Sequence, residues 1–224
     1  MGTITRTFAN NITTSGVFKP TAFNNASFDN VTAVPEGSLP AGGNMVLLST
    51  QTASASSSIS FTTGIDSTYK EYMFIFNNIH PSTSANFSFN LSTDGGSSYN
   101  VTKTSTNFGA YHNEPDTDTY LAYDISQDLA QSTDYQKLTM GGSAGANDAD
   151  RSFSGTLTLF NPSNTTYVKH FISNSNFMDS NASAYTVNAY VAGYGNTTSA
   201  INAIDFKFSS GNIDDGTIQM FGIL

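Results

Sequence analysis

Three histidines, His80, His112 and His170, are the side chains of this sequence whose ordinary pKa suits proton transfer near neutral pH. No two of them stand at a spacing typical of metal ligands. A zinc site would need them to converge in space with carboxylates. His80 and His170 stand at the ends of predicted strands, so we expect turn-capping or inter-strand hydrogen bonds there and no metal site.

Acidic residues gather in three short segments, where alternating carboxylates could bind calcium. They are Glu114, Asp116 and Asp118, then Asp148 and Asp150, and finally Asp214 and Asp215. None of the segments matches the twelve-position calcium loop, which also needs a ligand at its last position. Because turns use Asp and Asn for their backbone hydrogen bonds, we expect these segments to be solvated turns.

The residue patterns of common catalytic sites are missing from the sequence. Residues 152–155 (SFSG) lack the strand–turn–helix context and the partnered histidine of a nucleophile elbow. No glycine-rich motif for phosphate binding is present. Two carboxylates can hydrolyse a glycoside, but Asp94, Glu114 and Asp116 all stand in turn-like contexts. We therefore expect no catalytic residues and no cofactor, and a protein that is not an enzyme.

Tyrosine and phenylalanine supply the whole 12% aromatic content, and tryptophan is absent. The phenylalanines that fall on predicted strand faces are expected in the core: Phe74, Phe76, Phe87, Phe89, Phe153 and Phe160. Tyrosines near loops present an apolar ring with a polar hydroxyl, which suits contact with a protein or a glycan. Six tyrosines lie near predicted loops, Tyr190 among them, and the candidate surface-contact residues are Tyr99, Tyr111, Tyr120, Tyr123 and Tyr194.

Composition separates this chain from an ordinary cytosolic enzyme. Charged residues make up 11%, against about 25% in a typical soluble domain. The surface must therefore be built of Ser, Thr, Asn and Gly, which is typical of virion proteins, adhesins and fibres. A net charge of −9 with 8 Lys and Arg residues makes partners among nucleic acids and anionic membranes unexpected. There is no cysteine, and we expect no signal peptide and no membrane helix.

Short alternating segments separated by turn signals predict an all-β chain. Residues 69–79 (YKEYMFIFNNI) form the strongest predicted strand, central and covered on both faces. Residues 86–92 and 99–106 are expected to pair as a hairpin, as are 152–160 and 167–172. Residues 107–134 are expected to hold one short strand or one helical turn. The spacing predicts an antiparallel β-sandwich of jelly-roll type over residues 44–224.

Residues 1–43 have no helical period, and their apolar residues are too scattered to close a core alone, yet they keep a steady supply of Ile, Phe and Val. A solvated disordered tail lacks such residues. We therefore expect an extended N-terminal arm that lies on a neighbouring subunit or a larger particle. Its expected anchors are Ile4, Phe8, Ile12, Val17, Phe18, Phe23 and Phe28.

Several segments resemble a family of small virion structural proteins of marine tailed phages, including phages of cyanobacteria and pelagic bacteria. The resembling segments of the body are 64–72 (GIDSTYKEY), 76–81 (FNNIHP), 111–114 (YHNE), 159–162 (LFNP), 167–171 (YVKHF), 191–194 (VAGY) and 196–201 (NTTSAI). The C-terminal segments 206–213 (FKFSSGNI), 216–218 (GTI) and 221–223 (FGI), and the start of the arm, 1–11 (MGTITRTFANN), resemble it as well. The resemblance implies a β-rich virion component without catalytic residues, and it leaves the location in the particle open.

From these observations we expect a homotrimer located in the virion and made in the host cytoplasm. The favoured role is a capsid decoration, or cement, protein whose arm clamps neighbouring subunits of the major capsid protein. The alternative is a tail fibre or adhesin whose tyrosines contact a host surface glycan. A polysaccharide depolymerase is the least favoured hypothesis.

Overall fold

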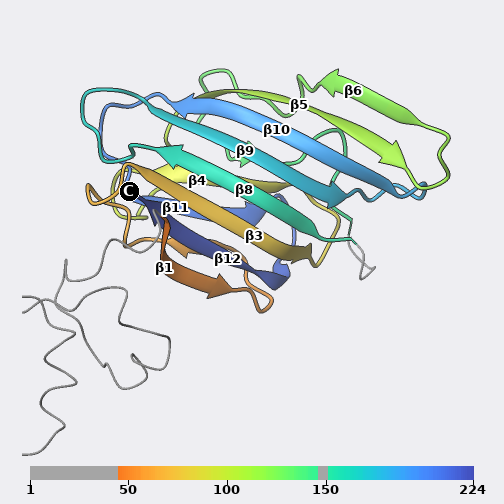
Figure 1. Ribbon diagram of the computed structural model, residues 1–224, viewed down its shortest axis with the longest axis horizontal. Helices are drawn as coiled ribbons and strands as arrows, with labels where there is room; N and C mark the ends of the chain where they lie inside the picture. The colour runs from red at the N-terminus through yellow and green to blue at the C-terminus, as the bar shows by residue number, and fades with distance from the viewer. Residues whose placement is uncertain (1–44, 146–150) are drawn as a thin grey trace, which may run out of the picture. The chain divides into compact units, whose positions relative to one another are not determined.

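The computed structural model describes residues 45–145 and 151–224 (Figure 1). The expected arm and all seven of its anchors lie outside these residues, so the arm stays a prediction. Within the described ranges the chain forms twelve strands and no helix, and accordingly no helix that could span a membrane. The strands are β1 (Met45–Thr52), β2 (Ile59–Phe61), β3 (Glu71–Pro81), β4 (Phe87–Ser92), β5 (Lys103–Asn113), β6 (Thr119–Tyr123), β7 (Gln136–Lys137), β8 (Phe153–Phe160), β9 (Lys169–Met178), β10 (Tyr185–Gly195), β11 (Ala203–Phe208) and β12 (Ile213–Ile223).

The strands form two antiparallel sheets that face each other, which confirms the predicted β-sandwich. The smaller sheet has the order β2-β11-β4-β7, and the larger has the order β1-β12-β3-β8-β9-β10-β5-β6. The chain alternates between the sheets from β2 to β5 and again from β10 to β12, as in the two Greek keys of a jelly roll. The first four strands of the larger sheet, β1-β12-β3-β8, and the four of the smaller sheet follow the jelly-roll order, and β9, β10, β5 and β6 extend the larger sheet beyond β8.

Phenylalanine rings fill the space between the sheets. Phe206 of β11 lies 5.2 Å from Phe76 of β3, and Phe87 of β4 lies 4.8 Å from Phe153 of β8, measured between ring centroids. All four side chains are at most 1% exposed. Each such burial stabilises the fold by about 1.5–3 kcal/mol, and edge-to-face contacts between the rings add to it.

Three expectations about the core and the pairing are wrong. Residues 99–106 do not form the hairpin partner of β4, because the chain crosses there into the larger sheet and β5 pairs with β10 and β6. Strand β3 is fully covered only on its inner face, since Met73 and Ile75 on the outer face remain partly exposed. Phe160 is also only partly buried, because its position opposite Glu71 places it on the same outer face.

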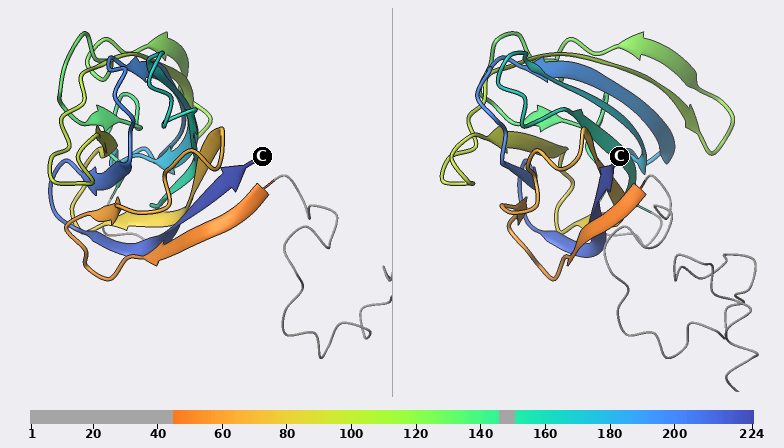
Figure 2. Two further views of the ribbon diagram at one scale, coloured as in Figure 1. Left: turned by 90° about the vertical axis from the view of Figure 1, so that its left-hand side faces the viewer. Right: turned by 60° about the vertical axis from the view of Figure 1, so that its left-hand side comes forward.

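The first part of residues 107–134 contains more β-strand than expected. Strand β5 runs through to Asn113, and β6 returns beside it as the edge of the larger sheet. The hairpin expected between residues 152–160 and 167–172 is confirmed as β8 and β9. Strands β5, β9 and β10 have 10 or 11 residues, whereas β4 and β11 have 6. The long strands therefore extend past the smaller sheet, as two further views show (Figure 2).

Candidate interaction surface

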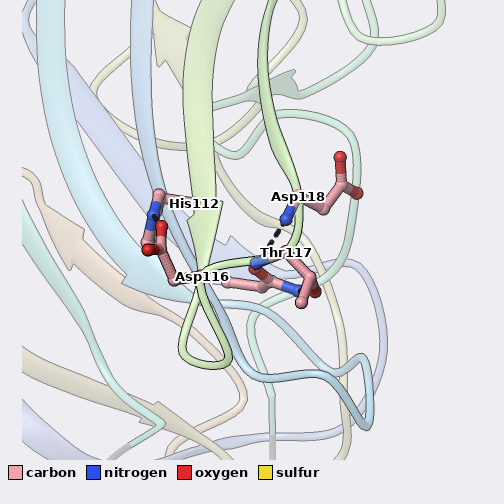
Figure 3. A network of polar contacts seen from close by, with 5 residues as sticks. His112, Asp116, Thr117 and Asp118 are labelled. Carbon is pink, nitrogen blue, oxygen red and sulfur yellow. Dashed lines mark hydrogen bonds and ion pairs between the residues drawn. The ribbon is translucent and has the colours of Figure 1, made fainter.

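A tight turn joins β5 to β6 and fixes the free edge of the larger sheet (Figure 3). The Asn113 side chain is buried, and its Oδ1 accepts hydrogen bonds from the backbone N–H groups of Thr117 and Asp118, each at 2.9 Å. Asp116 adopts a left-handed backbone conformation, with φ of 56°, which aspartate tolerates in turns. Its Oδ1 lies 3.0 Å from His112 Nε2. The acidic residues 116 and 118 thus belong to a turn that positions β6.

An aromatic row crosses the outer face of the larger sheet beside this edge. Tyr123 of β6 stands opposite Phe108 of β5, which stands opposite Tyr190 of β10. The rings of Phe108 and Tyr190 are stacked, 5.3 Å apart with an interplanar angle of 13°. These side chains are 41–49% exposed, and Leu121 on the same face is 74% exposed. We call Tyr123, Phe108, Tyr190 and Leu121 the outer aromatic row.

Three tyrosines lie on the opposite face of the same strands. Tyr111 of β5 stands opposite Tyr120 of β6, and its ring lies 5.0 Å from Tyr185 of β10 in an edge-to-face arrangement. Tyr111 and Tyr185 line an open cleft of about 420 Å³, together with Asp179 and Asn181. We call this the tyrosine cleft. It combines apolar rings with carboxylate, amide and hydroxyl groups.

Tyrosine hydroxyls on these surfaces are held as hydrogen-bond donors. Tyr123 donates to Asp128 Oδ2 at 2.6 Å, and Tyr185 donates to Asp118 Oδ2 at 3.0 Å. These hydrogen bonds to carboxylates raise the pKa of both tyrosines, because they favour the protonated phenol. The hydroxyls therefore stay neutral over the physiological range, and the surfaces offer stacking and hydrogen bonding.

The structure gathers three of the five predicted contact tyrosines. Tyr111, Tyr120 and Tyr123 meet on β5 and β6, on the two faces of the sheet edge. Tyr194 lies beside His170, seven residues along β10 from the position opposite Tyr111, or about 23 Å at the rise of a strand. Tyr99 is partly buried in the connection between β4 and β5.

The sequence analysis missed Phe108 and Leu121 as contact candidates, and it placed Tyr190 only near a loop. One set of alternate residues in β5 faces outward, namely residues 104, 106, 108, 110 and 112. The residues between them are mostly small or polar, and these face the interior. In most strands the apolar set faces inward, so the pattern of β5 concealed which side was exposed. Pairing with β10 is what places Phe108 outside.

The histidines and acidic residues remain dispersed. His80 lies in β3 opposite Asp215 of β12, and His170 lies in β9 opposite Tyr194 of β10. Asp148 and Asp150 fall outside the described residues. In ranges 45–145 and 151–224, no three His, Asp or Glu side chains come together as metal ligands would.

The outer aromatic row and the tyrosine cleft are thus the two surfaces near β6 that offer a binding chemistry. Both present apolar rings and uncharged donors. Comparisons of this chain with protein-family models, curated proteins and solved structures give no match.

Proposed function

We propose that this chain is a non-enzymatic structural protein of a phage particle, and specifically a capsid decoration protein. The observation that carries the proposal is the outer aromatic row, a group of exposed apolar side chains on adjacent strands of a chain with only 11% charged residues. Exposed apolar patches of this kind mark protein contacts. The sequence resemblance to virion structural proteins supports the same role.

The contact expected at the outer aromatic row is with protein. Aromatic side chains are enriched at the buried centres of protein interfaces, and charged residues are depleted there. Full burial of side chains of this size contributes about 1.5–3 kcal/mol each. The partners are other copies of the chain in a homotrimer and subunits of the major capsid protein, onto which residues 1–43 would clamp.

Strand β6 adds an open sheet edge to this surface. Its backbone pairs with β5 on one side, and its other side carries N–H and C=O groups available to another strand. Addition of a strand to such an edge gives affinity through backbone hydrogen bonds and specificity through side chains. A virion protein that is present in many copies can use this edge for assembly.

Copy number in purified virions tests the proposal directly. A capsid decoration protein should be present in hundreds of copies and be labelled over the head by antibody. A few tens of copies at the tail would contradict it, as would absence from the particle. In parallel, deletion of residues 1–40 should leave a folded domain that no longer joins the particle, and normal incorporation of that form would refute the clamp.

The tyrosine cleft favours one alternative, a tail adhesin that binds a host surface glycan. Tyr111 and Tyr185 offer ring faces and edges for stacking against sugars, while Asp179 and Asn181 offer hydrogen-bonding groups. Calorimetric titration with host surface polysaccharide separates the two roles. Binding that is lost in Tyr111→Ala, together with a tail location, would establish the adhesin in place of the decoration protein.

A further inference from the structure

A buried lysine and a buried asparagine meet at the side of the smaller sheet, beneath the segments that connect β4 to β5 and β6 to β7. Lys103 begins β5 in the larger sheet, Asn90 lies in β4 of the smaller sheet, and both residues are 0% exposed. Lys103 Nζ lies 2.5 Å from Asn90 Oδ1 and 2.7 Å from the carbonyl oxygen of Val101. A primary amine thus touches a carboxamide in a site that excludes water.

The carboxamide of Asn90 is held in one orientation by its other hydrogen bonds. Its Oδ1 also accepts from the backbone N–H of Leu91 at 2.8 Å. A fixed N–H donor at a carbonyl oxygen stabilises the negative charge that develops there when a nucleophile adds to the carbon. Nδ2 donates to the carbonyl oxygens of Tyr99 at 2.6 Å and Thr133 at 2.9 Å. These acceptors are in place for the hydrogens of a departing ammonia.

The surroundings of Lys103 favour the unprotonated amine. Burial lowers its pKa to about 7, because the ammonium loses its hydration, and the negative charge of Asp134 opposes this shift. An amine without its extra proton has the free electron pair that a nucleophile needs. A substantial fraction of Lys103 is therefore reactive at neutral pH.

A buried carboxyl group stands beside the amide. Asp205 of β11 lies directly opposite Asn90 in the pairing of β4 with β11, and it is 3% exposed. Directly opposite residues of an antiparallel pair have Cβ atoms about 4.5–5.5 Å apart. Its two oxygens accept hydrogen bonds from Ser60 Oγ and from the Tyr135 hydroxyl. The Asn90 carboxamide therefore stands beside a carboxyl group whose two oxygens are held by other donors.

We propose that Lys103 and Asn90 form an intramolecular isopeptide bond. Lys103 Nζ adds to Cγ of Asn90, the bond from Cγ to Nδ2 breaks, and ammonia leaves with one proton that comes from the amine. The carboxamide carbon keeps its oxidation state, so the reaction needs no oxidant or other reactant. The product joins β4 to β5 and therefore ties the two sheets of the sandwich together covalently.

Lys169 provides a matched control inside the same protein. It is also 0% exposed, and it stands in the same row of the larger sheet, since Gly195 is opposite both lysines. Its Nζ donates to the backbone carbonyls of Tyr167 and Thr197, at 2.6 and 3.3 Å. These bonds give Lys169 no side-chain carboxamide to attack, so it should remain a free amine.

Mass spectrometry of the purified full chain tests the bond. The intact mass should be lower than the sequence mass by one ammonia. Trypsin cleaves after a free lysine, so the denatured protein should be cut after Lys169 and left uncut after Lys103. The fragment of residues 71–137, which contains both partners, should carry the lost ammonia. This digest uses the wild-type protein and does not depend on whether a variant folds.

Two variants test whether Lys103 is the residue that displaces the ammonia. Lys103→Arg should restore the full sequence mass, whereas Lys169→Arg should keep the loss of ammonia. A wild-type protein of full mass that trypsin cuts after Lys103 would overturn the proposal. A loss of ammonia that persists in Lys103→Arg would overturn it as well, because the ammonia would then come from another residue.

Discussion

Each face of the larger sheet carries side chains that are unfavourable in its surroundings: lysines on the buried inner face and large apolar side chains on the outer face. The inner face buries two lysines, Lys103 and Lys169, beside a core of phenylalanine rings. The outer face exposes Phe108, Tyr190 and Leu121 to water. On the inner face each lysine finds oxygen acceptors within the chain. On the outer face the stacked rings cover each other only in part.

This difference separates the residues that stabilise the fold from the residues that bind a partner. A buried amine costs free energy unless its hydrogen bonds are made, and both lysines make them with neighbouring strands and loops. Their effects should therefore appear in stability. An exposed aromatic row costs the free domain little, and its burial gains free energy only when another surface covers it. Its effects should appear in assembly.

The largest expected effect is a difference in stability between variants of the two buried lysines. Lys103→Met and Lys169→Met both remove a buried amine and its contacts with backbone carbonyls, so these losses are shared. Lys103→Met also removes the proposed link between residues thirteen apart in the sequence. A link that closes a loop of roughly this size is worth about 3 kcal/mol in the unfolded-state entropy model. Urea-induced unfolding should show Lys103→Met to be less stable than Lys169→Met by about that amount, and equal losses would contradict the link.

A smaller effect is expected in the pH dependence of the free energy of unfolding, where the two lysines can again be compared. Burial lowers the pKa of Lys169 below its ordinary value of 10.5, so the unfolded chain binds more protons than the folded chain in the interval below 10.5. Stability at this site should therefore rise with pH through that interval, by no more than about 1.4 kcal/mol per pH unit. Lys169→Met should remove the rise, as urea unfolding at successive pH values would measure.

Lys103 should contribute nothing to this profile, because an amide nitrogen does not titrate there. A free amine at residue 103 would instead add a rise in stability that begins near its pKa of about 7. A rise from neutral pH that disappears in Lys103→Met would therefore show that the amine is free and the link absent.

The sequence predicted the sandwich because most strands keep a clear alternation and turn signals separate them. It did not predict the face of β5, where Ser105, Asn107 and Gly109 point inward. Ser105 and Asn107 make hydrogen bonds to distant partners, as when Asn107 Nδ2 donates to the Thr139 carbonyl. Such contacts depend on the tertiary fold, and a local pattern does not contain them.

The residues of the candidate interaction surface were also predictable only in part. Tyrosines 111, 120 and 123 are close in sequence, and a hairpin brings them together. Tyr190 joins them only through the pairing of β5 with β10, which are about eighty residues apart in the chain. The contact of Lys103 with Asn90 likewise depends on a crossing between sheets, and the sequence analysis expected a hairpin there.

The smallest expected effect on stability lies on the outer face, at Leu121. This side chain is 74% exposed on the edge strand, and Leu121→Thr keeps a residue that favours strands. The free energy of unfolding of the dissociated chain should change by less than about 0.5 kcal/mol. Light scattering across a dilution series should nevertheless show weaker self-association. Leu224→Thr is the matched control, since Leu224 is 62% exposed beyond the last strand and outside the outer aromatic row. If both variants associate as the wild type does, the row is not the contact between copies; if Leu121→Thr alone unfolds the domain, the outer face serves the fold as the inner face does.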